Sequence, residues 1–559
     1  MIEMINKKRR IILASVFFLM TLIGLLVTPN YGMPWDELME IRTLGTNLRE
    51  YATVFTGEEG EPQESNTGIV FTDVTENPDI DHGQSVYYPL TPALFMDLGV
   101  EAPRTLMLIF HAYTFLIFML GVVGLYFIST HLTGEWKYGL LASLFLYLSP
   151  RFFAEGHYNS KDIISMSMII LCFWFFIKMT ESKKILYAVL FAVFGAFAAN
   201  MRMTGVFFFG LAGVLYLITL TVRKEWNKKN FLMGLLSVVT FIGFYFLLTP
   251  VAWKDPIAFI SYVFARSSNY SDWDGYVFYM GAAQRPVPWH YIPVMIAITT
   301  PILLVLLIAV GNLTAIASIA RTKVKDVFGG PLKYYLMCLV FTWIFLGYAM
   351  IRQPILYDSW RHFYFLNGLM ITLAVFCVKK IMDLLKGNFK RIVVGIVALQ
   401  LLASGLIIAV NNPYELTYFN FFAGSDPAAM YEMDYWNVTQ ANALMKLIDT
   451  VNSDKVISVT AAEWVSADGL MKAYNILPEA YKSRMKVALG QYGGMNTKAG
   501  YLMVSLRAYQ HSTDKSIKPE ERWVPDVGLE NFQSVYKEVV VLNAFGSDFM
   551  TIYEIPKVG

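Results

Sequence analysis

Apolar segments close to 20 residues long recur along the first three quarters of this chain, and they constrain its fold more than any other feature. A helix of about 20 apolar residues crosses the roughly 30 Å hydrocarbon core of a membrane. Of the 559 residues, 56% are hydrophobic and only 16% are charged, against roughly 25% in soluble domains. We expect eleven membrane helices, at residues 11–28, 105–129, 138–150, 162–178, 185–200, 204–222, 231–250, 291–313, 334–351, 363–378 and 392–410.

Clusters of Lys and Arg indicate the orientation of these helices. Cytoplasmic loops of membrane proteins carry an excess of both residues, and the basic run Lys7-Lys8-Arg9-Arg10 places the N-terminus in the cytoplasm. With alternating crossings, the other dense clusters fall on the same side, at residues 178–184, 223–229, 321–333 and 379–391. We therefore expect an integral plasma membrane protein. Because no cleavage pattern follows the first helix, we expect that helix to be retained.

Two loops and a C-terminal region are expected outside the cytoplasm. In the first loop (29–104), apolar residues at spacings of three and four predict a surface helix from Glu37 to Phe55. The further loop covers 251–290. The expected fold is an α-helical membrane module at 1–411, followed by a small extracytoplasmic α/β domain at 412–559. Alternating or β-branched runs in that domain predict strands at 455–459, 499–506, 539–542 and 549–555, and a helix is expected at 441–451.

The first charged feature outside the cytoplasm is the acidic pair Asp36-Glu37. Pro34 and Trp35 precede the pair and anchor the chain where the first helix leaves the membrane. A carboxylate held there could take a proton from an acceptor hydroxyl group. Alternatively, Asp36 only caps the helix that follows, a position that favours acidic residues.

A polar connector from Ser149 to Asp162 joins two expected membrane helices. Arg151 and Lys161 could hold a phosphate group, the former through a bidentate fork and the latter as a point charge. His157 and Asp162 could bind a divalent metal ion. Alternatively, Asp162 caps the next helix and the cations reach lipid headgroups.

Further cations follow on the same side of the membrane. Arg202 lies at a break between two apolar segments, where a charge is costly and therefore typical of function, although it too could reach headgroups. Before the tenth helix, Asp358 can pair with Arg361 on one helical turn, which leaves Arg352 for an anion. The aromatic residues around them, and those beside His290, could also form an interfacial belt.

Absent motifs narrow the function. Neither G-x-G-x-x-G nor a Walker-type loop occurs, so nothing indicates a nucleotide site. The three cysteines fall in expected membrane helices, so we expect no disulfide framework, and nothing suggests binding to nucleic acid. Mid-membrane charge is scarce, with His111 the main exception, whereas a proton-coupled transporter usually needs such groups.

Several short motifs, taken in order, resemble the GT-C superfamily of polytopic glycosyltransferases. The nearest group is the protein mannosyltransferase-like family 39, and the likeness covers about residues 10–380. The motifs are Asp36-Glu37, Tyr87-Tyr88-Pro89-Leu90, Pro150-Arg151-Phe152 through Asp162, Arg202-Met203-Thr204-Gly205, Leu356-Tyr357-Asp358 and Arg361-His362. Residues 412–420 and 431–436 resemble segments of bacterial members with a C-terminal extension.

The resemblance implies transfer of a sugar from a polyprenyl-phosphate carrier to an extracytoplasmic glycan, lipid or protein. Asp36 matches the proposed catalytic base, with Glu37 beside it, and Asp162 matches a position near the site or a metal. The expected phosphate ligands are Arg151, Lys161, Arg202, Arg352 and Arg361. The expected substrate-binding residues are Tyr87, Tyr88, His290, Tyr357, Asp358 and His362. Because a sugar phosphate carries its own leaving group, one base suffices, and we expect inversion by direct displacement.

Other functions remain open from the sequence. A polymerase or ligase that moves a whole lipid-linked oligosaccharide would need the same phosphate-binding residues. A lipid or solute transporter is a second alternative, and a non-catalytic membrane protein with a partner-binding C-terminal domain is a third.

Overall fold

The computed structural model of the protein describes residues 2–57, 63–74, 76–77, 79–268, 275–451, 455–462, 464–490, 495–506 and 536–556. Within these ranges, nine helices are long and apolar enough to cross a membrane. They are α1 (Ile2–Val27), α3 (Ala102–Thr133), α6 (Asp162–Ser182), α8 (Thr204–Arg223), α9 (Lys228–Leu248), α12 (Ile302–Ala320), α14 (Leu332–Arg352), α15 (Asn367–Leu384) and α16 (Asn388–Asn411).

Each of the eleven expected membrane segments coincides with a helix. The two shortest are α4 (Trp136–Tyr147) and α7 (Ile185–Met201). The segment expected at 291–313 is divided at Pro301 into α11 (Tyr291–Thr299) and α12, because proline interrupts the helical hydrogen bonds. Helix formation satisfies every backbone polar group within lipid, so apolar runs of this length have no other stable single-chain structure there.

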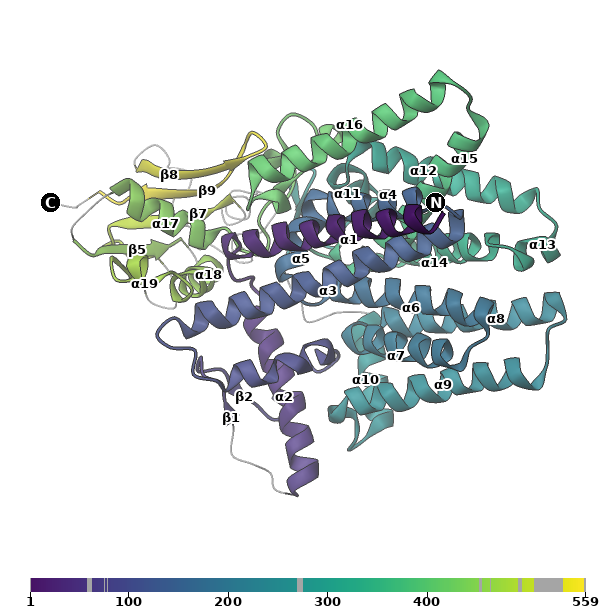
Figure 1. The fold of residues 1–559 in the computed structure, drawn as a ribbon. Helices are drawn as coiled ribbons and strands as arrows, with labels where there is room; N and C mark the ends of the chain where they lie inside the picture. Colours follow the sequence, from purple (N-terminus) through teal and green to yellow (C-terminus); the bar gives the residue numbers. More distant parts are fainter. Residues whose placement is uncertain are drawn as a thin grey trace.

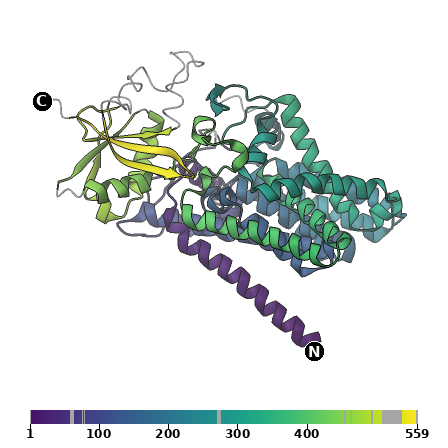
Figure 2. The same cartoon turned by 90° about the horizontal axis from the view of Figure 1, so that it is seen from above.

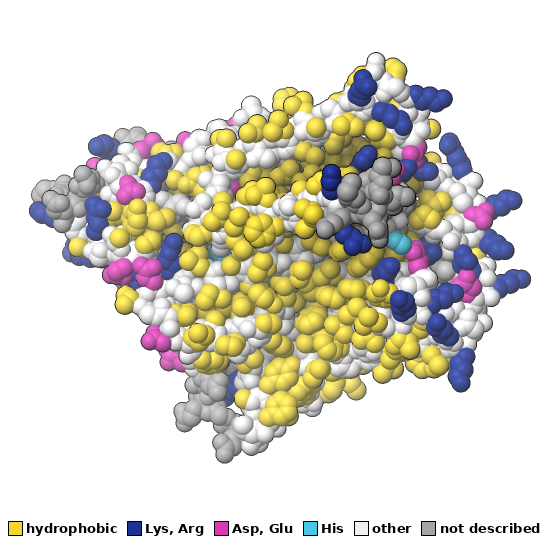
Figure 3. Space-filling model, in the orientation of Figure 1, with side chains coloured by type: hydrophobic (Ala, Val, Ile, Leu, Met, Phe, Trp, Pro, Cys, Tyr) yellow, Lys and Arg dark blue, Asp and Glu magenta, His cyan; other side chains and the backbone are white. Residues whose placement is uncertain are grey.

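The membrane helices lie side by side, with α6 and α15 inside the bundle and α1 and α16 at its edge (Figure 1 and Figure 2). Exposed apolar side chains on α16 include Leu399, Leu402 and Leu406. Figure 3 shows a broad hydrophobic band, with Lys and Arg gathered at the end of the bundle near the N-terminus. This surface is that of an integral membrane protein.

The segment expected to form the first outside loop, residues 29–104, crosses the other end of the bundle. It contains α2 (Glu37–Thr56), as the sequence predicts, followed by a short hairpin and a turn of 3-10 helix. In Figure 1, α2 runs across the helix ends rather than along them. The further loop contains α10 (Pro256–Ser268) and a second hairpin. The remaining elements of both loops are β1 (Gln63–Glu64), β2 (Val70–Phe71), η2 (Ser85–Leu94), η3 (Pro250–Ala252), β3 (Val277–Tyr279) and β4 (Ala282–Gln284).

The connector between α4 and α6, which the sequence left irregular, forms the buried helix α5 (Pro150–Tyr158). Pro150 starts it, a position that proline tolerates because no backbone donor is lost there. The short helix α13 (Val324–Gly329) joins α12 to α14, and η4 (Arg361–Leu366) leads into α15.

A five-stranded mixed sheet, in the order β6-β5-β7-β9-β8, confirms the predicted C-terminal α/β fold. β5 pairs with β6 and β7 in parallel, whereas β9 pairs antiparallel with β7 and β8. The sequence predicts four of these strands but misses the short β6. The strands are β5 (Ile457–Ala461), β6 (Met485–Val487), β7 (Tyr501–Ser505), β8 (Lys537–Ala544) and β9 (Ser547–Glu554). The helices are α17 (Gln440–Val451), α18 (Trp464–Asn475) and α19 (Glu479–Lys482).

Candidate active site

The acidic pair of the first outside loop lies where α2 begins, with Asp36 at the N-cap position. The Asp36 side chain makes no capping hydrogen bond. Its Oδ2 instead lies 3.5 Å from Lys161 Nζ and 3.4 Å from Arg361 Nη1. The alternative role as a helix cap therefore does not describe this carboxylate, which faces two cations from distant parts of the chain.

Lys161 also pairs with a second carboxylate of α2, that of Glu40, which lies 3.0 Å from His82 Nε2. Burial alone would raise the pKa of Asp36, but Lys161 and Arg361 outweigh it and hold that pKa below its ordinary value. For Glu40, Lys161 and His82 likewise outweigh burial and lower the pKa to about 2. Both carboxylates are therefore ionised at neutral pH.

Arg361 is buried, although it carries a charge. Three aromatic rings surround its guanidinium group, with ring centres 4.8, 5.3 and 4.4 Å from the guanidinium carbon: Tyr357, Tyr435 and Trp436. Such cation–π contacts partly compensate for lost hydration. The last two rings belong to the segment that follows the final membrane helix, so the C-terminal region helps to hold this cation in place.

Asp162 joins two arginines at the start of α6. Its Oδ1 accepts a hydrogen bond of 2.8 Å from Arg202 Nη2, and its Oδ2 lies 3.9 Å from Arg361 Nη1. The capping role that the sequence allowed for Asp162 is performed by Asn159, whose Oδ1 accepts from the backbone N–H of Asp162 at 2.9 Å. The carboxylate of Asp162 is thereby left to position the arginines.

A cavity of about 180 Å³, here called the ion-lined cavity, lies beside these charges. Its polar lining includes Lys161, Asp162, Arg202, Arg361 and His362. Its apolar lining includes Phe345, Tyr348, Pro354, Ile355, Leu356, Phe363 and Phe365. A cavity lined by both charged and apolar side chains suits a ligand whose anionic head is attached to a hydrocarbon chain.

The two outside loops meet at the rim of the ion-lined cavity. Arg266 of α10 lies 3.4 Å from both Asp79 and Asp81 of the first loop. Burial lowers the pKa of the neighbouring His82, but the carboxylates of Glu40 and Asp81 outweigh this effect and raise it to about 9. His82 is therefore protonated at neutral pH and links this rim to α2.

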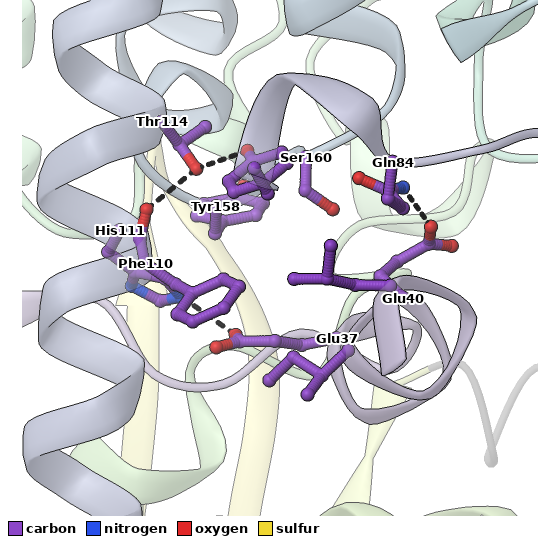
Figure 4. A pocket seen from close by; sticks show the side chains of 11 residues that line it. Glu37, Glu40, Gln84, Phe110, His111, Thr114, Tyr158 and Ser160 are labelled. Carbon is purple, nitrogen blue, oxygen red and sulfur yellow. Dashed lines mark hydrogen bonds and ion pairs between the residues drawn. The ribbon is translucent and has the colours of Figure 1, made fainter. Parts of the chain in front are cut away.

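Glu37 points into a small closed space between α2 and α3 (Figure 4). Its Oε2 lies 2.8 Å from His111 Nε2, whereas its Oε1 has no hydrogen-bond partner among the described residues. Thr114 and Tyr158 line the same space, which has a volume of about 10 Å³ and holds roughly one water molecule. The structure thus separates the two residues that the sequence grouped together, because Asp36 contacts two cations that line the ion-lined cavity and Glu37 contacts His111 of α3.

Two of the expected phosphate ligands do not line the ion-lined cavity. Arg151 is buried in α5, where its Nε donates to the backbone carbonyl of Tyr418 at 3.0 Å and its guanidinium group lies over the Phe419 ring. Arg151 therefore ties the membrane helices to the segment after α16. Arg352 is exposed at the end of α14.

The expected metal ligands His157 and Asp162 have no partner in common. Both ring nitrogens of His157 face backbone carbonyls, Nδ1 at 2.9 Å from Phe153 and Nε2 at 3.1 Å from Gly24. Burial lowers the pKa of His157 to about 4. Over the described ranges, no group of three or more His, Cys, Asp and Glu side chains is arranged to hold a metal ion.

The expected substrate-binding residues fall into two sets. Tyr357 and His362 line the ion-lined cavity, and Asp358 lies 3.5 Å from Arg361 Nε. The second set makes hydrogen bonds within the protein, away from that cavity: Tyr87 with Thr114, Tyr88 with the carbonyl of Leu248, and His290 with Tyr279.

Sequence reasoning missed four residues of the site. Glu40 stands four positions after Asp36, so helical spacing alone places both on one face and could have identified it. No comparable signal marks His82. Tyr435 and Trp436 lie in the segment 431–436 that resembles bacterial family members, but that resemblance does not place them at Arg361, because their positions depend on how the C-terminal segment packs.

The fold and the site define a polytopic membrane protein with a cavity lined by charged side chains at the ends of its helices. Residues 89–253 match the family described as dolichyl-phosphate-mannose-protein mannosyltransferase. This match confirms, over that segment, the resemblance to the protein mannosyltransferase-like GT-C enzymes. No curated protein matches the sequence.

Several solved structures share distant likeness with the chain. The crystal structure of ArnT from Cupriavidus metallidurans bound to undecaprenyl phosphate has 12% identity and a TM-score of 0.44, over 98% of each chain. Its apo state has the same identity and TM-score, over 97% of this chain and 98% of ArnT. The cryo-EM structure of arabinofuranosyltransferase AftD from Mycobacteria has 12% identity and a TM-score of 0.38, over 97% of this chain and 41% of AftD.

Proposed function

We propose that this protein is a glycosyltransferase that moves a sugar from a polyprenyl-phosphate donor to an acceptor outside the cytoplasm, with inversion at the anomeric carbon. One observation carries the proposal. The ionised carboxylate of Asp36 is held by Lys161 and Arg361 next to a cavity that both charged and apolar side chains line.

The donor phosphate competes with Asp36 for its cations. Once Lys161 and Arg361 turn to the phosphate, the pKa of Asp36 rises toward its ordinary value, and the carboxylate becomes a better base. The acceptor hydroxyl oxygen then bonds to the anomeric carbon, and its proton passes to Asp36. The bond from that carbon to the phosphate oxygen breaks, and Arg202 and Arg361 stabilise the departing polyprenyl phosphate.

The hydrocarbon tail extends from the apolar lining residues of the cavity along α8 and α14. Both helices carry exposed apolar side chains near this end, among them Phe207, Trp343 and Ile344. With the Lys- and Arg-rich end of the bundle in the cytoplasm, the ion-lined cavity and the C-terminal sheet lie on the extracytoplasmic side.

The test is sugar release in proteoliposomes from a panel of radiolabelled undecaprenyl-phosphate monosaccharides. Asp36→Asn keeps the size of the side chain but removes its charge, and we expect at least a 1,000-fold loss of turnover with donor binding retained. Equal turnover by both proteins would remove Asp36 as the base. Retention of the donor's anomeric configuration in the product would remove direct displacement, and flipping of the donor by Asp36→Asn would favour a transporter.

A further inference from the structure

A second cavity, of about 290 Å³, lies against a different face of α2 from the one that carries Asp36 and Glu40. Five separate parts of the chain line it: Met33, α2, the turn at 67–70, the start of α3 and α18 of the C-terminal region. Figure 1 shows these elements at the end of the bundle that carries the sheet. We call it the α18 cavity, and no step of the proposed donor chemistry uses it.

Charged groups reach the α18 cavity from two sides. Arg42 and Glu37 extend from α2, and Lys472 extends from α18. The Glu37 side chain is only 6% exposed, and its Oε1 has no hydrogen-bond partner among the described residues. The Nε of Arg42 is likewise buried without a partner there. Buried polar atoms are rarely left unsatisfied, so the Nε of Arg42 marks a place where a ligand can supply the missing bond.

The rest of the lining is apolar, with Leu38, Ile41, Ile69, Leu106 and Met107 on its surface. Apolar side chains beside two cations match a molecule that has a hydrocarbon part and an anionic group. A neutral sugar would bring no negative charge to Arg42 and Lys472, and a simple inorganic anion would leave the apolar surface uncovered.

The α18 cavity is also joined directly to the residue before the proposed base. Lys472 Nζ donates a hydrogen bond of 2.9 Å to the backbone carbonyl of Trp35 and lies 4.8 Å from the centre of the Trp35 ring. Its other partner is Asp468, at 2.5 Å on the same helix. A ligand held by Lys472 therefore lies next to the start of α2, where Asp36 stands.

We propose that the α18 cavity binds the acceptor, and that the acceptor is an amphiphile with an anionic group near the hydroxyl that receives the sugar. Arg42 and Lys472 hold the anionic group, and the apolar lining holds the hydrocarbon part. This inference rests on the proposed glycosyl transfer, in which the ion-lined cavity binds the donor. The C-terminal region then has a defined role, since α18 supplies one side of the acceptor site.

Cysteine labelling can test both cavities separately in the full-length protein. All three native cysteines are buried, so they give little background. Asn475→Cys places a thiol on an exposed lining residue of the α18 cavity, and Ser267→Cys places one on the lining of the ion-lined cavity. The maleimide labelling rate of each variant is measured in nanodiscs with dodecyl phosphate, dodecyl maltoside or undecaprenyl phosphate.

We expect dodecyl phosphate, but not the neutral maltoside, to slow labelling of Asn475→Cys at least fivefold. Adding Arg42→Gln or Lys472→Met should raise the half-protecting concentration about tenfold, as for one lost charge-assisted hydrogen bond. Unchanged labelling, equal protection by the maltoside or protection that survives both substitutions would overturn the inference. Undecaprenyl phosphate should protect Ser267→Cys in every background, which also shows that the variants are folded. If only the protection of Ser267→Cys by undecaprenyl phosphate fails, the result counts against the proposed donor site rather than against the α18 cavity.

Discussion

Asp36, beside the ion-lined cavity, and Glu37, in the small space between α2 and α3, are adjacent in the chain, yet their carboxylates are held in opposite ways. Asp36 remains 21% exposed and shares both of its cations with other carboxylates. Glu37 is buried and faces one imidazole, that of His111. Cations that are shared beside a cavity can turn to an incoming anion, whereas a buried pair cannot separate without leaving an unpaired charge. Exchangeable partners, rather than burial, therefore distinguish the proposed base from its neighbour.

The largest effect after loss of Asp36 is expected from Arg361→Lys. Lysine keeps the charge but lacks the planar group that contacts Asp36, Asp162 and three aromatic rings together. We expect kcat/KM for the donor to fall about 100-fold, in line with the loss of one preorganised charge at a transition state. Arg352→Lys, an exposed arginine outside the cavity, is the matched control. A drop of less than threefold at Arg361 would show that the phosphate is held elsewhere.

Removal of one of the aromatic rings that surround Arg361 should have an intermediate effect on donor binding. Trp436→Leu is expected to weaken donor binding about tenfold, and Trp436→Phe two- to threefold, since a smaller ring retains part of the cation–π attraction. The readout is the donor KM and kcat, with Trp226→Leu as a control at the far end of the bundle. Equal losses for Leu and Phe would mean that the ring acts only by filling space.

Glu37→Gln tests the second carboxylate in the comparison between Asp36 and Glu37. The amide keeps the volume of the side chain and can still hydrogen-bond to His111, so we expect sugar release to fall less than about fivefold. The assay is run beside Asp36→Asn on the same donor. A loss as large as that of Asp36→Asn would make Glu37 a catalytic residue and erase the distinction between the two carboxylates.

The smallest expected effect is on the pH dependence of thermal stability, and it comes from His82. Because the pKa of His82 is raised to about 9, its stabilising contribution is complete below its ordinary value near 6.5 and disappears as the pH rises through 9. His82→Gln should therefore lower Tm by about 2 °C at pH 6 and by almost nothing at pH 9.5. Thermal unfolding in detergent, followed by exposure of the buried cysteines to a thiol dye, measures both values. A difference that grows with pH would contradict the pairing of His82 with Glu40 and Asp81.

The membrane helices were predictable because lipid allows a long apolar run only one structure. The surface helix was predictable from the spacing of apolar residues after Glu37, and most strands of the C-terminal sheet from β-branched runs. The buried helix α5 was missed because its polar composition resembles a loop. Its polar side chains are instead satisfied inside the protein, as Glu155 is by Asn159 and Tyr364.

The sequence predicted which charged residues belong to the site, but not which of them contact one another. Asp36, Lys161, Arg202 and Arg361 could be selected because charge near hydrocarbon is costly. The sequence could not separate them from Arg151, which has the same composition signal but faces a backbone carbonyl of the segment after α16. Partners that lie hundreds of residues apart follow from tertiary packing, which no local pattern encodes.

The aromatic enclosure of Arg361 has a consequence for how the protein is made. Tyr435 and Trp436 emerge from the ribosome after every membrane helix, so the rings can reach the guanidinium group only after all these helices have been made. During synthesis the cation has only part of its final surroundings, although all the helices are already in place. Catalytic competence is therefore acquired at the end of biogenesis, so that a chain interrupted before residue 435 can insert into the membrane without becoming an active enzyme.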